Sequence, residues 1–164
     1  MNLQFYLEKL LISKEFEEFK KEMPNSYFCS GFFIIEEGKG NKIHIDYFEP
    51  ENKKMFSFQL ESGCEKIPID QVYEENPAKI LDNVDFNFEE IGKMIEEKMQ
   101  KESIKNKIQK ILLSLQSKDE KNFLIGTIFI SSLGLLKIKI DLEKNEIVEF
   151  EKKSFFDMMK IVKK

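Results

Sequence analysis

Alternation of apolar and polar residues predicts two groups of three β-strands, one in each half of the chain. We expect strands over residues 27–37, 42–48 and 54–61 in the first group and over residues 123–130, 136–142 and 147–150 in the second. The leading strand of each group is apolar on both of its faces. Strands of this kind are usually buried on both sides of their sheet, so we expect cover on both sides here.

The two groups also resemble each other residue by residue. Residues 42–46 read Lys-Ile-His-Ile-Asp, residues 137–141 read Lys-Ile-Lys-Ile-Asp, and Gly31 and Gly126 stand at the same spacing as these segments. An apolar helical stretch precedes each group. We therefore predict an α+β fold of two tandem helix-plus-three-stranded antiparallel meander units with a C-terminal helix. The alternative is that two unrelated amphipathic hairpins share one pattern.

Apolar residues spaced three and four positions apart predict the helices. The first covers residues 3–23 and ends before Pro24. The second covers residues 88–116 and begins at Asn87, which stands three residues before a glutamate as in a capping box. The apolar stripe of this second helix slips at residues 100–103, where we expect a kink or a break into two helices.

These elements divide the chain into a first unit at residues 1–61, a linker or loop at residues 62–86 and a second unit at residues 87–164, forming one compact domain or two lobes. Within the linker, Pro77 predicts a short helix over residues 77–81. The order of elements resembles that of tandem cystatin-like or inhibitor-type repeats and that of type III secretion chaperones. Because the resemblance rests on element order alone, it implies no functional residue.

Composition narrows the class of partner. The chain has 26 basic side chains, all of them Lys, and a net charge of −4. Arginine is the residue best suited to bidentate recognition of phosphates and base edges, so nucleic-acid binding is not expected. No apolar stretch reaches the ~20 residues of a membrane span, and the N-terminal residues lack a signal-peptide pattern. We expect a cytoplasmic protein with free thiols, Cys29 buried in a strand and Cys64 exposed in a loop.

The sequence contains no pattern typical of a catalytic or metal site. His44 is the only histidine, it is expected on the outward face of its strand, and no serine or cysteine motif accompanies it. Residues 85–96 are rich in carboxylates, but Glu90 stands where a calcium loop needs glycine. Residues 38–42 are glycine-rich but lack the Gly-Lys-Ser/Thr ending of a phosphate loop, so they predict a hairpin turn. We expect no cofactor.

The C-terminal residues carry the strongest functional signal. From a cap at Ser154 they predict a helix that is apolar almost all round, and Phe155, Met158, Met159 and Val162 are the candidate partner-binding residues. Such a helix either lies inside the fold or offers an apolar patch to a protein partner or to a second copy of the chain. The favoured hypothesis is a non-enzymatic protein-interaction module, adaptor-like or chaperone-like. The alternative is a small-molecule-binding protein or enzyme with an apolar pocket between helix and sheet.

Overall fold

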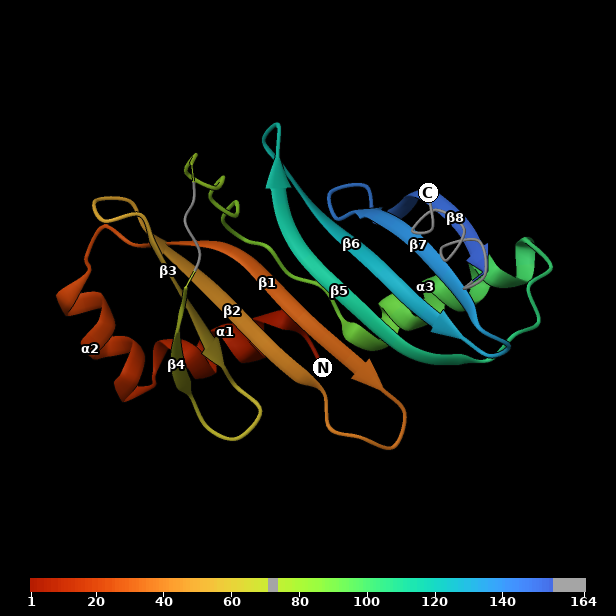
Figure 1. The fold of residues 1–164 in the computed structure, drawn as a ribbon, viewed down its shortest axis with the longest axis horizontal. Coiled ribbons are helices and arrows are strands. Elements are labelled where there is room, and N and C mark those ends of the chain that lie inside the picture. The colour runs from red at the N-terminus through yellow and green to blue at the C-terminus, as the bar shows by residue number, and fades with distance from the viewer. Residues whose placement is uncertain (71–73, 155–164) are drawn as a thin grey trace.

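The protein is built on one eight-stranded antiparallel β-sheet with the strand order β4-β3-β2-β1-β5-β6-β7-β8 (Figure 1). The computed structural model describes residues 1–70 and 74–154. The strands are β1 Tyr27–Glu36, β2 Lys42–Glu49, β3 Lys54–Gln59, β4 Glu65–Ile69, β5 Ile108–Lys118, β6 Lys121–Ile130, β7 Gly134–Asp141 and β8 Glu146–Ser154. The helices are α1 Leu3–Leu11, α2 Lys14–Glu22 and α3 Phe88–Lys101.

The prediction of two tandem helix-plus-three-stranded units is wrong, because the two halves of the chain share one sheet. β1 pairs antiparallel with β5, from Gly31 opposite Leu115 to Glu36 opposite Lys110. Each half also contains a strand that the sequence pattern did not predict, since β4 follows β3 and β5 precedes β6. The hydrogen bonds between β1 and β5 therefore join the strands of both halves into a single sheet.

The helices also differ from their prediction. The stretch predicted as one helix over residues 88–116 is α3 followed by β5, with Ser103 between them at a φ of 57°. β5 forms there because its backbone pairs with a strand on each side. The stretch predicted as one helix over residues 3–23 is α1 and α2. Ser13 starts α2 as its N-cap, and its hydroxyl oxygen accepts a hydrogen bond from the Phe16 N–H at 3.2 Å.

Residues 77–81 do not form the predicted short helix. They begin a segment of residues 77–86, which we call the crossing segment, that runs from the start of β1 to the start of α3 with a turn at residues 82–83. The Ile80 N–H donates to the Phe28 carbonyl at 2.9 Å. The Leu81 N–H donates to the side-chain oxygen of Asn122 at 3.1 Å. The first residues of β1 are not paired with β5, so their backbone groups are free to bind this segment.

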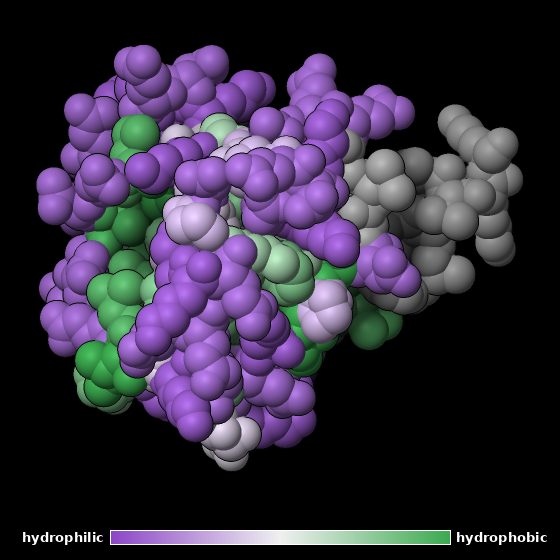
Figure 2. Space-filling view, turned by 90° about the vertical axis from the view of Figure 1, so that its left-hand side faces the viewer, coloured by the Kyte–Doolittle hydropathy of each residue, from purple (hydrophilic) through white to green (hydrophobic). Residues whose placement is uncertain are grey.

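The three helices of the described residues lie against one face of the sheet, which we call the core face, and Figure 1 shows α1 and α3 behind the strands. The helical side chains buried there include Leu3, Leu10, Phe16, Phe19, Ile91 and Ile95. Side chains from alternate strand positions meet them, among them Phe33, Ile43, Phe58, Leu113, Ile128 and Leu136. We call the opposite side of the sheet the open face. Seen from the end that carries α2 and β4, the surface is mainly hydrophilic, with hydrophobic residues between (Figure 2).

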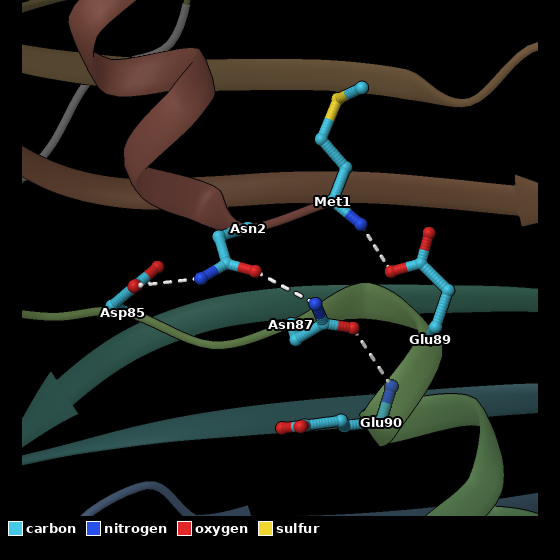
Figure 3. Close-up of polar contacts among 6 residues, drawn as sticks. All are labelled: Met1, Asn2, Asp85, Asn87, Glu89 and Glu90. Atoms are coloured by element: carbon cyan, nitrogen blue, oxygen red, sulfur yellow. Dashed lines mark hydrogen bonds and ion pairs between the residues drawn. The ribbon is translucent and has the colours of Figure 1, made fainter.

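The start of the chain is tied to the start of α3 (Figure 3). Asn2 and Asn87 form an isolated β-bridge, and the Asn87 amide donates to the Asn2 side-chain oxygen at 2.8 Å. The Asn2 amide in turn donates to the carboxylate of Asp85 at 3.3 Å, and the terminal amino group of Met1 pairs with Glu89. These contacts fix α1 and α3 relative to each other on the core face.

Candidate functional site

Strands β1, β5 and β6 carry apolar residues on the open face as well as on the core face. Successive side chains of a strand point to opposite faces, so Phe33, Leu113 and Ile128 are fully buried in the core while their neighbours point outward. The outward-pointing apolar residues, which we call the apolar strip, are Phe32, Ile34, Leu112, Ile125 and Phe129.

The apolar strip extends over three neighbouring strands, with Ser114 and Thr127 standing among its residues. Ile34 of β1 lies opposite Leu112 of β5, and Phe32 lies opposite Ser114, which lies opposite Ile125 of β6. The Cβ atoms of opposite residues in antiparallel strands are about 4.5–5.5 Å apart, so these side chains form rows across the sheet. The strip therefore occupies the centre of the open face.

Two residues of the apolar strip are exposed to solvent over about two fifths of their surface. Ile125 is 43% exposed and Phe129 is 39% exposed, whereas the other three are partly buried. Within residues 1–70 and 74–154, no helix packs on the open face. Within the single chain, the expected cover on both sides of these strands is therefore not present at these two positions, and cover by a second copy stays a prediction. Clustered apolar side chains on a surface are typical of binding sites.

Charged residues of both signs border the strip on its β7–β8 side. Lys137 lies opposite Glu151 and Lys139 lies opposite Glu149 in the pairing of β7 with β8. Together with Ile125, these side chains line a depression of about 680 Å³ on the open face. Each lysine on this border faces a glutamate, so the border has no excess of either charge. Such facing pairs attract each other modestly.

The border on the β2–β3 side is polar. His44 occupies the outward position predicted for it, and its Nε2 lies 2.8 Å from a carboxylate oxygen of Glu61. The Ser30 hydroxyl donates to the carboxylate of Asp46 at 2.7 Å. Burial raises the pKa of Asp46, and the hydrogen bonds from Ser30 and Ser57 only partly oppose this effect. Asp46 is therefore a carboxyl group whose ionised form is disfavoured by its surroundings.

These polar groups do not assemble a recognisable reactive centre. In the part of the chain that the structure describes, no serine or cysteine side chain is hydrogen-bonded to His44, and no three His, Cys, Asp or Glu side chains are grouped as metal ligands. Cys29 is buried as predicted, and burial raises the pKa of its thiol to about 12. Cys64, predicted to be exposed, is half-buried and accepts a hydrogen bond from the Ser13 hydroxyl at 3.4 Å. Neither thiol is poised as a nucleophile.

The predicted partner-binding residues Phe155, Met158, Met159 and Val162 lie outside the described residues, and so does the helix predicted to carry them. Ser154, predicted as the cap of that helix, is the last residue of β8. The apolar strip was not among the predicted site residues. Its signal in the sequence was the pair of strands with two apolar faces, but the unpredicted strand β5 is what joins them into one surface.

Comparisons with known proteins give one structural likeness. No protein-family model matches the chain, and no curated protein sequence matches it. The chain is similar to a solved structure described as a "putative lipoprotein" from Clostridium difficile 630, with 12% sequence identity, a TM-score of 0.53, and coverage of 85% of this chain and 90% of that one. None of the helices described is long and apolar enough for a membrane span. At this identity the likeness establishes a shared fold and nothing about activity.

Proposed function

We propose that this protein is a non-enzymatic protein-interaction module that binds a different protein on the open face of its sheet. The observation that carries the proposal is the exposure of the apolar strip at the centre of that face. Each Å² of apolar surface removed from water contributes roughly 25 cal/mol, so a partner that covers Ile125 and Phe129 gains binding free energy there.

The border of the apolar strip supports a protein partner over a membrane or a nucleic acid. Lys137 and Lys139 face Glu151 and Glu149 across the strand pair, so the basic groups do not form an uninterrupted surface. Anionic lipids and phosphate backbones attract clusters of basic groups without intervening acids. An apolar centre with a polar border is the usual anatomy of a protein–protein interface. We infer a partner that presents apolar side chains within a border of both charges.

The polar groups beside the strip support binding over catalysis. The His44 imidazole is engaged with Glu61, and the Asp46 carboxylate is engaged with serine hydroxyls. Nucleophilic and acid–base catalysis need a nucleophile, a base and a cavity for the reacting atoms in mutual reach. The groups described here hold each other and do not converge on such a cavity.

Packing on the core face disfavours the small-molecule alternative at the place predicted for it. The Phe33 ring lies between helix and sheet, with ring centroids of Phe86 and Phe88 at 5.6 Å and 5.3 Å. Aromatic rings at this spacing are in direct edge-to-face contact and leave no room for a ligand between them. The predicted pocket is therefore absent at the first turn of α3. At the other end of α3, Met99, Ile104 and Ile108 line a depression of about 510 Å³, which keeps the small-molecule hypothesis as the alternative.

Site-specific photocrosslinking tests the proposal. A photoreactive amino acid is placed at Ile125 or Phe129 on the open face, and at Glu97 on the exposed side of α3 as a control, in cells that normally make the protein. We expect the two open-face positions to yield the same discrete protein adduct and the control position not to yield it. Phe129→Asp should remove the adduct formed from position 125, because it places a charge in the apolar contact.

The other outcomes each count against a stated part of the proposal. Lipid adducts would replace the protein partner with a membrane surface, and an adduct of twice the chain mass would replace it with a second copy of this chain. Equal adducts from the control position, or no adduct from the open face, would remove the open face as the binding site. A few hundred daltons retained on the purified chain in native mass spectrometry would favour the small-molecule alternative.

A further inference from the structure

A separate pocket lies where the crossing segment passes the ends of α1, α2, β1 and β2. It has a volume of about 290 Å³, close to the smaller pockets that hold small-molecule ligands. We propose that this pocket binds a small organic anion with a phosphate or carboxylate group. The site shares no residue with the apolar strip, so the proposal does not rest on the protein-interaction function.

The first cationic group of the pocket is Lys20, from the last turn of α2. Its Nζ donates to the Ser26 carbonyl at 2.9 Å and, at 3.4 Å each, to the Ser26 hydroxyl and the Pro24 carbonyl. It also lies 5.9 Å from the centroid of the Tyr47 ring, so Lys20 acts on the pocket through its charge and not through a free N–H donor. These contacts hold the ammonium group at the wall of the pocket instead of letting it extend into solvent. Burial lowers the pKa of Lys20, and the positive charge of Lys79 lowers it further.

The second cationic group is Lys79, from the crossing segment. Lys79 and Lys20 line the same pocket from opposite elements, and neither forms an ion pair with a carboxylate among the described residues. Lys79 is exposed, and its charge acts on Lys20, whose pKa it lowers. Like charges repel, so an anion bound between the two ammonium groups would relieve this repulsion. Asp82 is the acidic residue among the described lining residues, and it is exposed. The pocket therefore carries an excess of positive charge.

The remaining walls favour an organic ligand over a bare ion. The Tyr47 ring is stacked on Phe28 at 5.9 Å, and both residues line the pocket. The Tyr47 hydroxyl forms no hydrogen bond with a described residue, so it is free to donate to a ligand oxygen. The side-chain amide of Gln4 is already used, because its Nε2 donates to the Val84 carbonyl at 2.8 Å. A ring or alkyl group against the aromatic wall and an anionic head near the lysines would match these surfaces.

An NMR titration of the full chain tests the inference. Amide signals are followed as inorganic phosphate or benzoate is added at constant ionic strength, which is kept with sodium chloride so that general screening does not change. We expect saturable shifts of amides in residues 79–83 and at Tyr27. Lys79→Gln should weaken binding about three- to fivefold, the size of one exposed charge pair. Lys152→Gln, at an exposed position on β8, should leave it unchanged.

The comparison of probes and variants separates the possible failures. Tighter binding of phosphate than of benzoate would identify the phosphate head as the preferred group, and the reverse would identify the carboxylate. Shifts no larger than those from sodium chloride, or equal affinity in Lys79→Gln and the parent protein, would overturn the inference. The Ile125→Asp variant should bind the anion as tightly as the parent protein, because Ile125 does not line the pocket. Loss of partner binding on the open face can therefore be told apart from loss of anion binding.

Discussion

Ile125 and Ile128 lie three residues apart on β6 but on opposite faces of the sheet, so replacing each with alanine measures the two faces against each other. Ile128 is 0% exposed and lies opposite Ile111 on one side and Leu136 on the other, within the core. Ile125 is 43% exposed on the open face. The two substitutions remove the same atoms from the same strand, so differences in β-propensity largely cancel.

The expected magnitudes follow from burial. Removing a fully buried isoleucine side chain to alanine costs about 2–5 kcal/mol, because lost transfer free energy and an unfilled cavity add together. Full burial of an isoleucine contributes about 1.5–3 kcal/mol, and little more than half of Ile125 is covered, so Ile125→Ala should cost about 1–1.5 kcal/mol. Water fills the space left at Ile125, so no cavity adds to that cost.

Urea denaturation followed by circular dichroism is the assay. With a slope of about 2 kcal/mol per M urea, Ile128→Ala should lower the midpoint by roughly 1–2.5 M and Ile125→Ala by roughly 0.5–0.8 M. The slopes of the variants must agree with the parent protein for this comparison to hold. Equal midpoints for the two variants, or a larger loss for Ile125→Ala, would refute the assignment of Ile125 to an exposed face and with it the apolar strip.

Three further changes test packing, charge and capping. A Cβ added at Gly126 would lie 2.7 Å from Ile138 Cγ1, so Gly126→Val should lower the free energy of unfolding in urea by about 1–3 kcal/mol. The additional change Ile138→Ala should recover part of this loss. No recovery would contradict a clash between these two positions. Burial raises the pKa of Asp46 in the folded state above its unfolded value of about 3.9. Folding therefore favours the protonated carboxyl, and the stability it contributes is complete below about pH 3.9. This stability is lost as the pH rises through the folded-state pKa. Asp46→Asn should therefore be more stable than the parent protein at pH 7 and lose that advantage below about pH 4, and a pH-independent difference in urea midpoints would contradict the assignment. Asn87→Ala should cost about 0.5–2 kcal/mol in thermal unfolding because its oxygen caps the Glu90 N–H, whereas Asn87→Ser should retain most of the stability, and equal losses would argue against a capping role.

The half-buried strands are the part of the fold that the sequence predicts well. Residues 42–48 were predicted where β2 spans Lys42–Glu49, and residues 136–142 where β7 spans Gly134–Asp141. A strand with one face in the core and one in water alternates strictly, and no helix has that period. The Asn87 cap was also predictable, because a side-chain acceptor before an acidic turn is a local signal.

The strands β4 and β5 were missed because their signals are not local. In β5, the apolar residues Ile108, Ile111, Leu112 and Leu115 fit a helical period as well as they fit a strand, and pairing with β1 and β6 decides between them. In β4, Pro68 is typical of a loop, but a proline is tolerated in a strand at the edge of a sheet. Because β5 joins β1 to β6, missing it also hid the apolar strip.

The central position of β1 has a consequence for the order in which the protein is made. One edge of β1 is paired by β2, which follows immediately, but the other edge is paired by β5, which is synthesised only after α3. At roughly 5–20 residues per second, the growing chain therefore spends several seconds with β1 as an outermost strand that is apolar on both faces. Unpaired apolar edges attract other chains. We therefore expect a chaperone to bind the nascent chain while only its N-terminal half has been made. Ribosome profiling of chaperone-bound chains should show binding that begins before residue 108 and ends once β5 has emerged.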